Sequence, residues 1–406
     1  MELWPILRAM RRNKIGAILI AVQIAVTLAI IANALTLIEQ RMAWSARPTG
    51  IDEANIFYIS AERVDQPKNL ASLQAADLAA LRSLNGVVDA YATNSYPLQG
   101  GGWSLTVTLA PNQKTPSAMT AYYFGDEHAL NTLGLKLMAG RNFRPAEIVV
   151  RDAAHAPPVG GFIVSEALAR KLFPAGDALG KSIFLEDAGV PAPIIGIVER
   201  LQGPFIGSTG FLSTFADNSA LAPYRPLDDS AEYLVRTQPG RLGGVMKAAE
   251  GALTAIDGSR LFHSKSMAEA HRDASHDDRG LVVLLSAVCI SLAAVTGFGI
   301  IGLTSYWVSQ RRRQIGIRRA VGATRMAIVR YFQTENLLIA TAGILLGMIL
   351  AIGLNLWMVS SFEMVRIDAV QIIGGAVALL LLGQLAALWP ALRAASIAPA
   401  LATRSD

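Results

Sequence analysis

One glycine-rich stretch has the residue types and the spacing of a phosphate-binding loop. Residues 175–182 read AGDALGKS, which fits the loop pattern if alanine is allowed at its first position. A working loop follows a buried strand and opens a helix, because backbone N–H groups and the helix N-terminus hold the phosphates. Here a helical stretch (SEALARKLF) precedes the glycines and a β-prone run (SIFLED) follows them. This order predicts a turn with a glycine at positive φ, and no nucleotide site.

Histidines with acidic residues could hold a metal, and a cysteine could act as a nucleophile. Zinc ligands on one helical face are about three or four residues apart, whereas His271 and His276 differ by five, which favours a solvated helix face. Cys289 lies inside a long apolar run, and the chain has no G-x-S-x-G motif. We therefore expect no catalytic residue, no metal ligand, no cofactor bound by this chain, and no enzymatic activity. Further residues of these types are His263, Asp273, Asp277 and Asp278, with His128 and His155 isolated.

The composition places much of this chain in a membrane. Of its 406 residues, 52% are hydrophobic and only 17% are charged, against about 25% charged in a typical soluble protein. This excludes a disordered chain, a coiled coil and an ordinary cytosolic enzyme, and the single cysteine excludes an intramolecular disulfide. A helix needs about 20 apolar residues to cross a bilayer. The stretches that qualify are residues 15–38, 280–310, 336–362 and 369–392.

The first apolar stretch has two interpretations. Ala32-Asn33-Ala34 resembles a signal-peptide cleavage site after a basic start. The apolar run, however, is longer than the about 7–15 residues of a signal-peptide core and continues past that site to Ile38, which favours an uncleaved membrane helix. Ahead of it, residues 1–14 place apolar side chains on one helical face and arginines mostly on the other, which predicts a short cytoplasmic interfacial helix.

The basic residues that flank the apolar stretches predict the orientation. Residues 1–14 and residues 311–335 are strongly basic, and basic flanks stay on the cytoplasmic side. The turn at residues 363–368 has a net charge of −1 and belongs outside. Residues 39–279, which are mildly acidic, then form one extracytoplasmic domain, while residues 393–406 form a cytoplasmic tail. The net charge of +5 thus reflects membrane topology, and we expect no nucleic-acid partner.

The segment between the first two apolar stretches predicts a mixed α+β domain. Residues 55–59, 70–84 and 87–92 read as strand, helix and strand, and residues 233–236, 240–256 and 259–263 repeat that order. Two such units can share one sheet in a split βαβ fold. Between them, residues of about 100–230 read as an inserted strand-rich subdomain. Its expected strands are 103–109, 122–124, 162–164, 182–185 and 193–198, and its expected helices are 127–133 and 165–173. Residues 269–279 are expected to continue into the second apolar stretch as one helical stalk.

The apolar stretches have no ionisable residue at mid-depth, where such residues mark ion pathways. They contain amides such as Asn355 and Gln384, and Glu335 at one edge. Small residues permit close contact between membrane helices. We expect packing roles for Gly297, Gly302, Glu335, Gly343 and Gly347, the last two in a G-x-x-x-G pair, either within one bundle or at a subunit interface.

The basic link at residues 311–335 combines arginines with apolar residues such as Ile315, Ile317 and Val321, and glycines at 316 and 322 divide it. Its charge could serve orientation alone. The added apolar surface favours docking to a cytoplasmic protein with an acidic or grooved surface. The expected contact residues are Arg311, Arg312, Arg313, Gly316, Arg318, Arg319, Gly322, Ala323 and Arg325.

Four runs, in three regions of the chain, resemble one known family. RRRQIGIRRAVGATRMAIVRYFQTE with the glycine-containing span after it resembles the FtsX/MacB-type permeases of ABC transporters. NTLGLKLMAGRNF and VSEALARKLFPAGDALGKSIFLEDAGVPAPIIGIVE are similar to the MacB-like extracytoplasmic core domain, and WPALRAASIAPALATR is similar to the family's C-terminus. Leu401-Ala402-Thr403 departs from the usual ending, which leaves the contact role of the tail open.

The resemblance implies a four-span permease in the inner membrane, with both termini cytoplasmic and the large domain periplasmic. It implies a second permease as partner, in a homo- or heterodimer, and a cytoplasmic ABC ATPase subunit that binds ATP and Mg, together with the lipid bilayer and a periplasmic adaptor. ATP hydrolysis would then drive export or conformational work outside the membrane by mechanotransmission. A membrane sensor that signals through an associated protein stays open as the alternative, and no residue pattern names the substrate.

Overall fold

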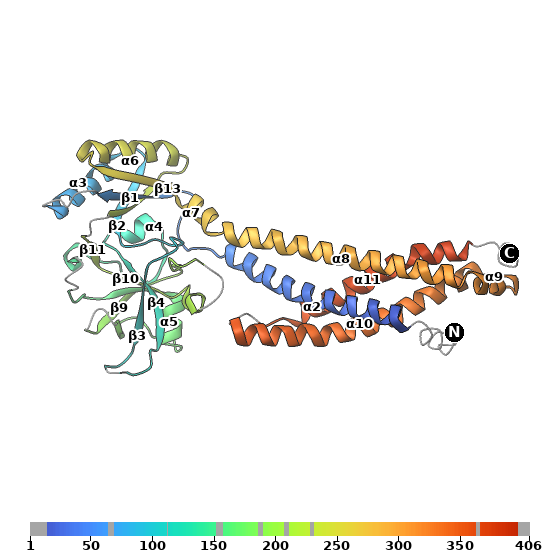
Figure 1. The fold of residues 1–406 in the computed structure, drawn as a ribbon. Helices are drawn as coiled ribbons and strands as arrows, with labels where there is room; N and C mark the ends of the chain where they lie inside the picture. Colours follow the sequence, from blue (N-terminus) through green and yellow to red (C-terminus); the bar gives the residue numbers. More distant parts are fainter. Residues whose placement is uncertain are drawn as a thin grey trace. The chain divides into compact units, whose positions relative to one another are not determined.

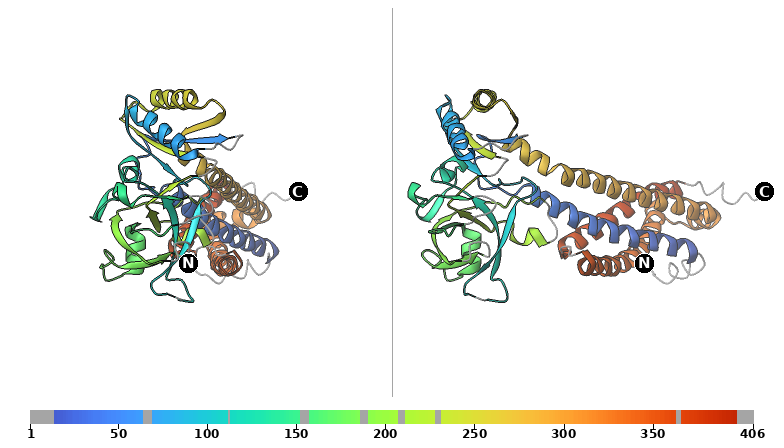
Figure 2. Two further views of the ribbon diagram at one scale, coloured as in Figure 1. Left: turned by 90° about the vertical axis from the view of Figure 1, so that its left-hand side faces the viewer. Right: turned by 60° about the vertical axis from the view of Figure 1, so that its left-hand side comes forward.

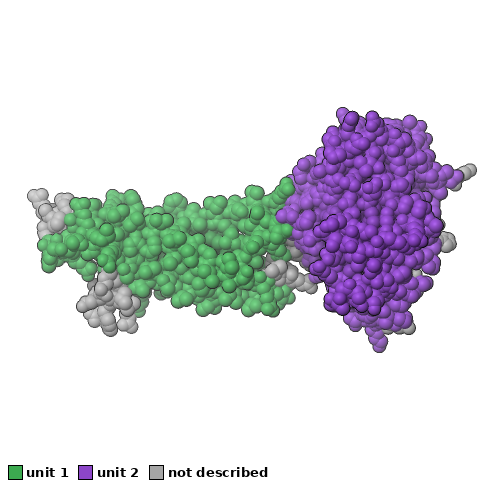
Figure 3. Space-filling model, turned by 180° about the vertical axis from the view of Figure 1, so that it is seen from behind, with its two compact units in different colours: residues 1–43, 278–406 green, residues 44–277 purple. Residues whose placement is uncertain are grey.

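A computed structural model describes residues 14–63, 69–111, 113–151, 157–185, 190–206, 211–227, 231–362 and 366–396. The chain divides into two compact units, residues 1–43 with 278–406, and residues 44–277 (Figure 3). Residues 1–13 of the expected interfacial helix at 1–14, and most of the expected tail at 393–406, lie outside the described residues.

The first unit contains four helices that are long and apolar enough to cross a membrane (Figures 1 and 2). They are α2 (Lys14–Ser45), α8 (His276–Gln310), α10 (Arg325–Phe362) and α11 (Ala369–Ala395). A shorter helix, α9 (Arg312–Ala320), links α8 to α10. Buried amides add to the packing: Asn33 donates to the carbonyl of Ala351 at 3.2 Å, and Asn336 donates to the carbonyl of Gly383 at 2.9 Å. These bonds join α2 to α10 and α10 to α11, where no water satisfies polar groups.

The second unit begins and ends with a four-stranded antiparallel sheet of order β13-β1-β12-β2. Its strands are β1 (Ile56–Arg63), β2 (Val87–Thr93), β12 (Ala231–Thr237) and β13 (Arg260–Ser266). Two helices, α3 (Leu70–Ser83) and α6 (Leu242–Ile256), pack on one face, where Phe57 and Ile59 meet Leu81 and Leu253. The strand residues between them, such as Tyr58, point to the opposite face and bury themselves in the core of the inserted subdomain.

The inserted subdomain is built on a seven-stranded sheet of order β5-β9-β7-β10-β4-β3-β8, and β8 also pairs with β9. That extra pairing closes the sheet on itself. The strands are β3 (Trp103–Thr108), β4 (Ala118–Phe124), β5 (Leu137–Gly140), β7 (Phe162–Ser165), β8 (Ser182–Leu185), β9 (Ala192–Val198) and β10 (Ser219–Ala222). A two-stranded parallel ribbon joins β6 (Val149–Arg151) to β11 (Tyr224–Pro226). Short helices complete it: α4 (Ala129–Leu133), α5 (Glu166–Leu172), and the 3₁₀ turns η1 (Pro145–Glu147) and η2 (Phe211–Phe215).

The expected fold class is confirmed: four apolar helices, with a large α/β domain between the first and the second. The two strand–helix–strand units share one sheet, as predicted. The turn at residues 175–182 follows α5 and precedes β8, with Gly176 at φ 83° and Gly180 at φ 80°. The strands β5, β6, β10 and β11, of three or four residues each, were missed, whereas β7 and β8, which are no longer, were predicted.

Helix boundaries in the stalk and in the link differ from the expectation. The stalk is helical from Met267 to Gln310, but Ser275 interrupts it between α7 (Met267–Ala274) and α8, which starts at His276. Helix α10 begins at Arg325, inside the interval expected to be a link, because the Thr324 hydroxyl accepts the backbone N–H of Ala327 at 3.2 Å and caps it.

Candidate functional site: the link between α8 and α10

Local sequence chemistry fixes the shape of this link. Gly322 has φ 101°, a conformation that glycine adopts without a Cβ penalty. The backbone N–H of Gly322 donates to the Arg319 carbonyl at 3.1 Å, and that of Ala323 donates to the Arg318 carbonyl at 3.0 Å. These two bonds form the Schellman motif that ends a helix. Thr324 then starts α10. The short turn between α9 and α10 is thus encoded by Gly-Ala-Thr.

The apolar residues of the link divide between an inner and an outer side. Ile315 and Ile328 are buried in a cluster with Phe332 and with the end of α11. Ile317 and Val321, by contrast, are 49% and 84% exposed. A helix that buries one face on the bundle and leaves apolar side chains on the other has a surface suited to a protein partner.

The arginines of the link differ in their surroundings. Arg311, one of the expected contact residues, donates through Nη1 to the Glu335 carboxylate at 2.8 Å, and 13% of its side chain is exposed. The Arg318 guanidinium lies 5.1 Å from the ring centre of Tyr331. Gly316 is buried inside α9, so it does not divide the link as Gly322 does. Arg312, Arg313 and Arg325 are exposed, and Arg319 and Ala323 are partly exposed.

The expected packing residues lie in different environments within the bundle. A Cβ on Gly343 would lie 2.7 Å from the Ala21 carbonyl oxygen, and one on Gly347 would lie 3.0 Å from Ala25. The G-x-x-x-G pair of α10 therefore holds α10 directly against the backbone of α2. Gly297 and Gly302 of α8 make no such contact: the nearest atom to a Cβ on Gly297 lies at 3.9 Å, and none lies within 4 Å at Gly302. Glu335 is buried, and its carboxylate forms an ion pair with Arg311.

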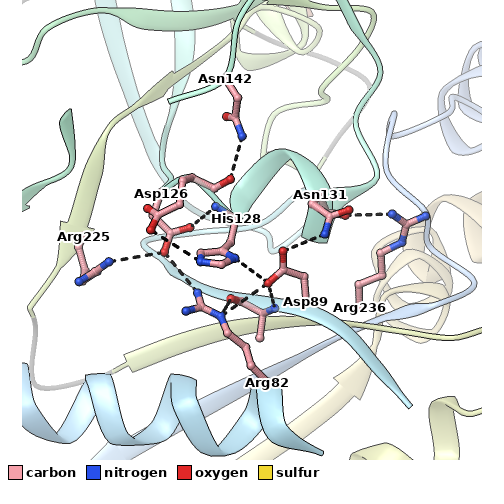
Figure 4. A network of polar contacts seen from close by, with 10 residues as sticks. Arg82, Asp89, Asp126, His128, Asn131, Asn142, Arg225 and Arg236 are labelled. Carbon is pink, nitrogen blue, oxygen red and sulfur yellow. Dashed lines mark hydrogen bonds and ion pairs between the residues drawn. The ribbon is translucent and has the colours of Figure 1, made fainter. Parts of the chain in front are cut away.

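A second group of polar residues lies in the outer unit, between the small sheet and the inserted subdomain (Figure 4). His128, expected to be isolated, contacts the Asp89 carboxylate of β2 at 2.8 Å through Nδ1. The Asp126 carboxylate is buried and accepts the backbone N–H of His128 at 2.9 Å, and burial raises the pKa of Asp126. Arg82 and Arg225 approach it at 3.6 and 3.9 Å. The group contains no nucleophile, and its contacts join the two parts of the domain.

Other polar contacts of the outer unit were also not predicted from the sequence. Asp77 and Arg260, both fully buried, form an ion pair between α3 and β13, and Tyr233 donates to the same carboxylate at 2.7 Å. His271 does not belong to a solvated face, since its ring nitrogens lie 2.8 Å from Glu53 and 3.0 Å from the carbonyl of Ser45. His155 lies outside the described residues.

Comparisons with known proteins match two regions of the chain. Residues 15–256 match the MacB-like periplasmic core domain, and residues 286–399 match the FtsX-like permease C-terminal domain. Similar relatives are the macrolide export ATP-binding/permease protein MacB of Chromobacterium violaceum, 27% identical over 55% of this chain and 33% of that protein, and MacB of Nitrobacter winogradskyi, 29% identical over 61% and 39%. The pyoverdine export ATP-binding/permease protein PvdT of Pseudomonas syringae is 26% identical over 57% and 35%.

Solved structures are similar only at low identity. The periplasmic region of MacB from Actinobacillus actinomycetemcomitans has a TM-score of 0.35 at 16% identity, and covers 55% of this chain and 94% of that one. The chain spans about a third of the length of the full-length relatives named above, and the matched domains are the permease part. The chain therefore belongs to the family of FtsX-like ABC transporter permeases that carry a MacB-like periplasmic core domain.

Proposed function

We propose that this chain is the permease subunit of an ABC exporter, and that a separate ATPase subunit, which binds ATP and Mg, docks on α9. The observation that supports this most is the outer side of the link, where exposed Arg312 and Arg313 accompany exposed Ile317 and Val321. An apolar patch with basic residues around it fits an acidic groove on a partner. The basic flanks favour a cytoplasmic location for this side, with both termini there and the large domain in the periplasm.

A second permease is part of the same proposal. Only 6% of the residues in the most apolar part of α8 are buried, against 44% in α2. Val288, Val295 and Phe298 are exposed on it, and Gly302 has open space around it. A helix with such a face gains contacts from a partner helix or from lipid. Either an identical or a sister permease could cover this face of α8. A periplasmic adaptor would bind the outer domain.

We further propose that the link transmits force to the outer domain through α8. Helix α9 follows α8 directly, and at the other end only Ser275 separates α8 from α7. The outer end of α8 is also tied to α2, because Arg41 donates to Asp278 at 2.5 Å in a mostly buried ion pair. Displacement of α9 by the ATPase would move α8 along its axis, and so perform work on a substrate outside the membrane. We propose that this work is export, because the similar proteins are named as export proteins.

The docking proposal is tested by the affinity of the full chain for its ATPase in lipid nanodiscs. Ile317→Glu and Val321→Glu each place a carboxylate in the proposed apolar contact, and we expect a loss of affinity of about tenfold or more. Leu261→Glu is the matched control, because Leu261 is 68% exposed on the outer unit. Unchanged affinity in both link variants, or an equal loss in the control, would rule out docking on α9.

A further inference from the structure

We propose that a small hollow between α9 and α10 binds the phosphate of an anionic phospholipid. Its polar lining consists of Arg311, Gln314, Arg318 and Tyr331, and its apolar lining includes Ile315 and Phe332. Neither Ile317 nor Val321 is among the residues that line the hollow. The site is therefore independent of the proposed ATPase docking surface, although both lie on the same link.

The charges around the hollow leave a cationic excess. Glu335 neutralises Arg311, which it contacts through Nη1 alone. Among the described residues, Arg318 has no carboxylate partner within ion-pair distance, and the contact seen for its guanidinium is the ring of Tyr331. A guanidinium with free N–H groups is suited to bidentate binding of a phosphate. Arg311 adds further donors, since a guanidinium carries five N–H groups and only one nitrogen is used here.

The depth of the hollow matches the layer where lipid phosphates lie. Arg311 directly follows the charge-free stretch of α8, which ends at Gln310. Tyr331 precedes the charge-free stretch of α10 by five residues, which is about 8 Å along a helix. The polar layer on each side of a bilayer core is about 5–8 Å thick, and tyrosine is enriched there. Basic pockets between membrane helices at this depth are suited to anionic headgroups.

The size of the hollow defines the ligand further. Its volume of about 20 Å³ holds one water-sized group, so a phosphate would insert one oxygen and leave the rest at the mouth. A nucleotide is too large for such a site. The apolar lining by Ile315 and Phe332 suits the glycerol and first acyl carbons, which free phosphate lacks.

Native mass spectrometry of the full chain, extracted from nanodiscs without any ATPase, tests the proposal. The nanodiscs contain phosphatidylcholine mixed with phosphatidylglycerol. We expect the wild type to retain phosphatidylglycerol preferentially, and Arg318→Gln to reduce that retention about fivefold. Arg325→Gln removes the same charge from an exposed position on the same link and is expected to retain the lipid. Glu335→Gln frees Arg311 and is expected to increase retention, a gain that misfolding cannot produce.

The opposite results would overturn the inference. Equal loss in the Arg318 and Arg325 variants would show general attraction by the basic link and no site. Equal retention of both lipids, or displacement of phosphatidylglycerol by millimolar inorganic phosphate, would exclude a phospholipid ligand. Because no ATPase is present, these outcomes do not depend on whether the docking proposal holds.

Discussion

Glu232 of β12 should make the stability of the outer domain depend on pH. Its carboxylate accepts a hydrogen bond from Gln99 Nε2 at 2.8 Å through one oxygen, and the other oxygen is buried without a hydrogen-bond partner among the described residues. Burial raises the pKa of Glu232 to about 7 from 4.5, and the bond from Gln99 opposes that shift only in part. The substitution Glu232→Gln keeps the acceptor for Gln99 and removes the titration.

The direction of the stability change with pH depends on whether the folded or the unfolded chain binds the proton. Between pH 4.5 and 7 the folded chain holds a proton that the unfolded chain has released, so stability falls as pH rises through this range and levels off above it. With these two pKa values, the loss between pH 5 and pH 8 is about 2 to 3 kcal/mol. At pH 5 the free energy of unfolding of the Gln variant should match that of the wild type within about 1 kcal/mol. At pH 8 it should exceed that of the wild type by about 2 to 3 kcal/mol.

The assay is urea unfolding of the outer domain in full-length chain reconstituted in nanodiscs, followed by pulse proteolysis at several pH values. The difference between wild type and variant at each pH isolates Glu232 from other titrating groups, such as Asp126, whose pKa is also raised by burial. A difference that stays constant from pH 5 to pH 8 would refute the reasoning, because the carboxyl would then titrate alike in the folded and the unfolded state.

Three further substitutions test the packing of the helix bundle, a buried ion pair and the turn after α9. Gly343→Ala should destabilise the helix bundle by about 1–3 kcal/mol because its Cβ meets the backbone of α2, whereas Gly302→Ala has open space and should not, as thermal unfolding in detergent would show. Asp77→Asn should lower the free energy of unfolding of the outer domain by about 3–5 kcal/mol, because it leaves Arg260 buried and unpaired. The control is Glu199→Gln in the exposed Lys136–Glu199 pair, which should lower it by less than about 1 kcal/mol in the same urea assay. Gly322→Ala should strain the turn by about 1 kcal/mol, and retained cross-linking between α9 and α10 across a cysteine pair would argue against that strain.

The apolar helices and the regular strands were predictable because their signals are local. Long charge-free runs define the membrane helices, and residues 55–92 show a clear change from strand to helical spacing and back. The sequence indicated that glycines divide the basic link, but it did not distinguish Gly322, which ends α9, from Gly316, which lies buried inside that helix. Short strands such as β6 and β11 were missed because their pairing partner lies far along the chain.

The polar groups of the site were less predictable, because their partners are distant in sequence. Arg311 and Glu335 are 24 residues apart, and Asp77 and Arg260 are 183 apart. Nothing in the local pattern distinguishes Arg311, which is paired, from Arg312, which is exposed. A single acidic residue at the edge of an apolar run, opposite a basic link, was the one available signal for the pair.

ATP turnover decides whether α9 couples the chain to an ATPase, as we propose. The measurement is ATP hydrolysis by the partner ATPase with wild-type chain, with Arg312→Gln/Arg313→Gln, and with Arg279→Gln, an exposed arginine at the other end of α8. We expect the chain to change the turnover rate, the double variant to lose this effect, and Arg279→Gln to keep it. Coupling that survives in the double variant, or that is lost equally with Arg279→Gln, would contradict it.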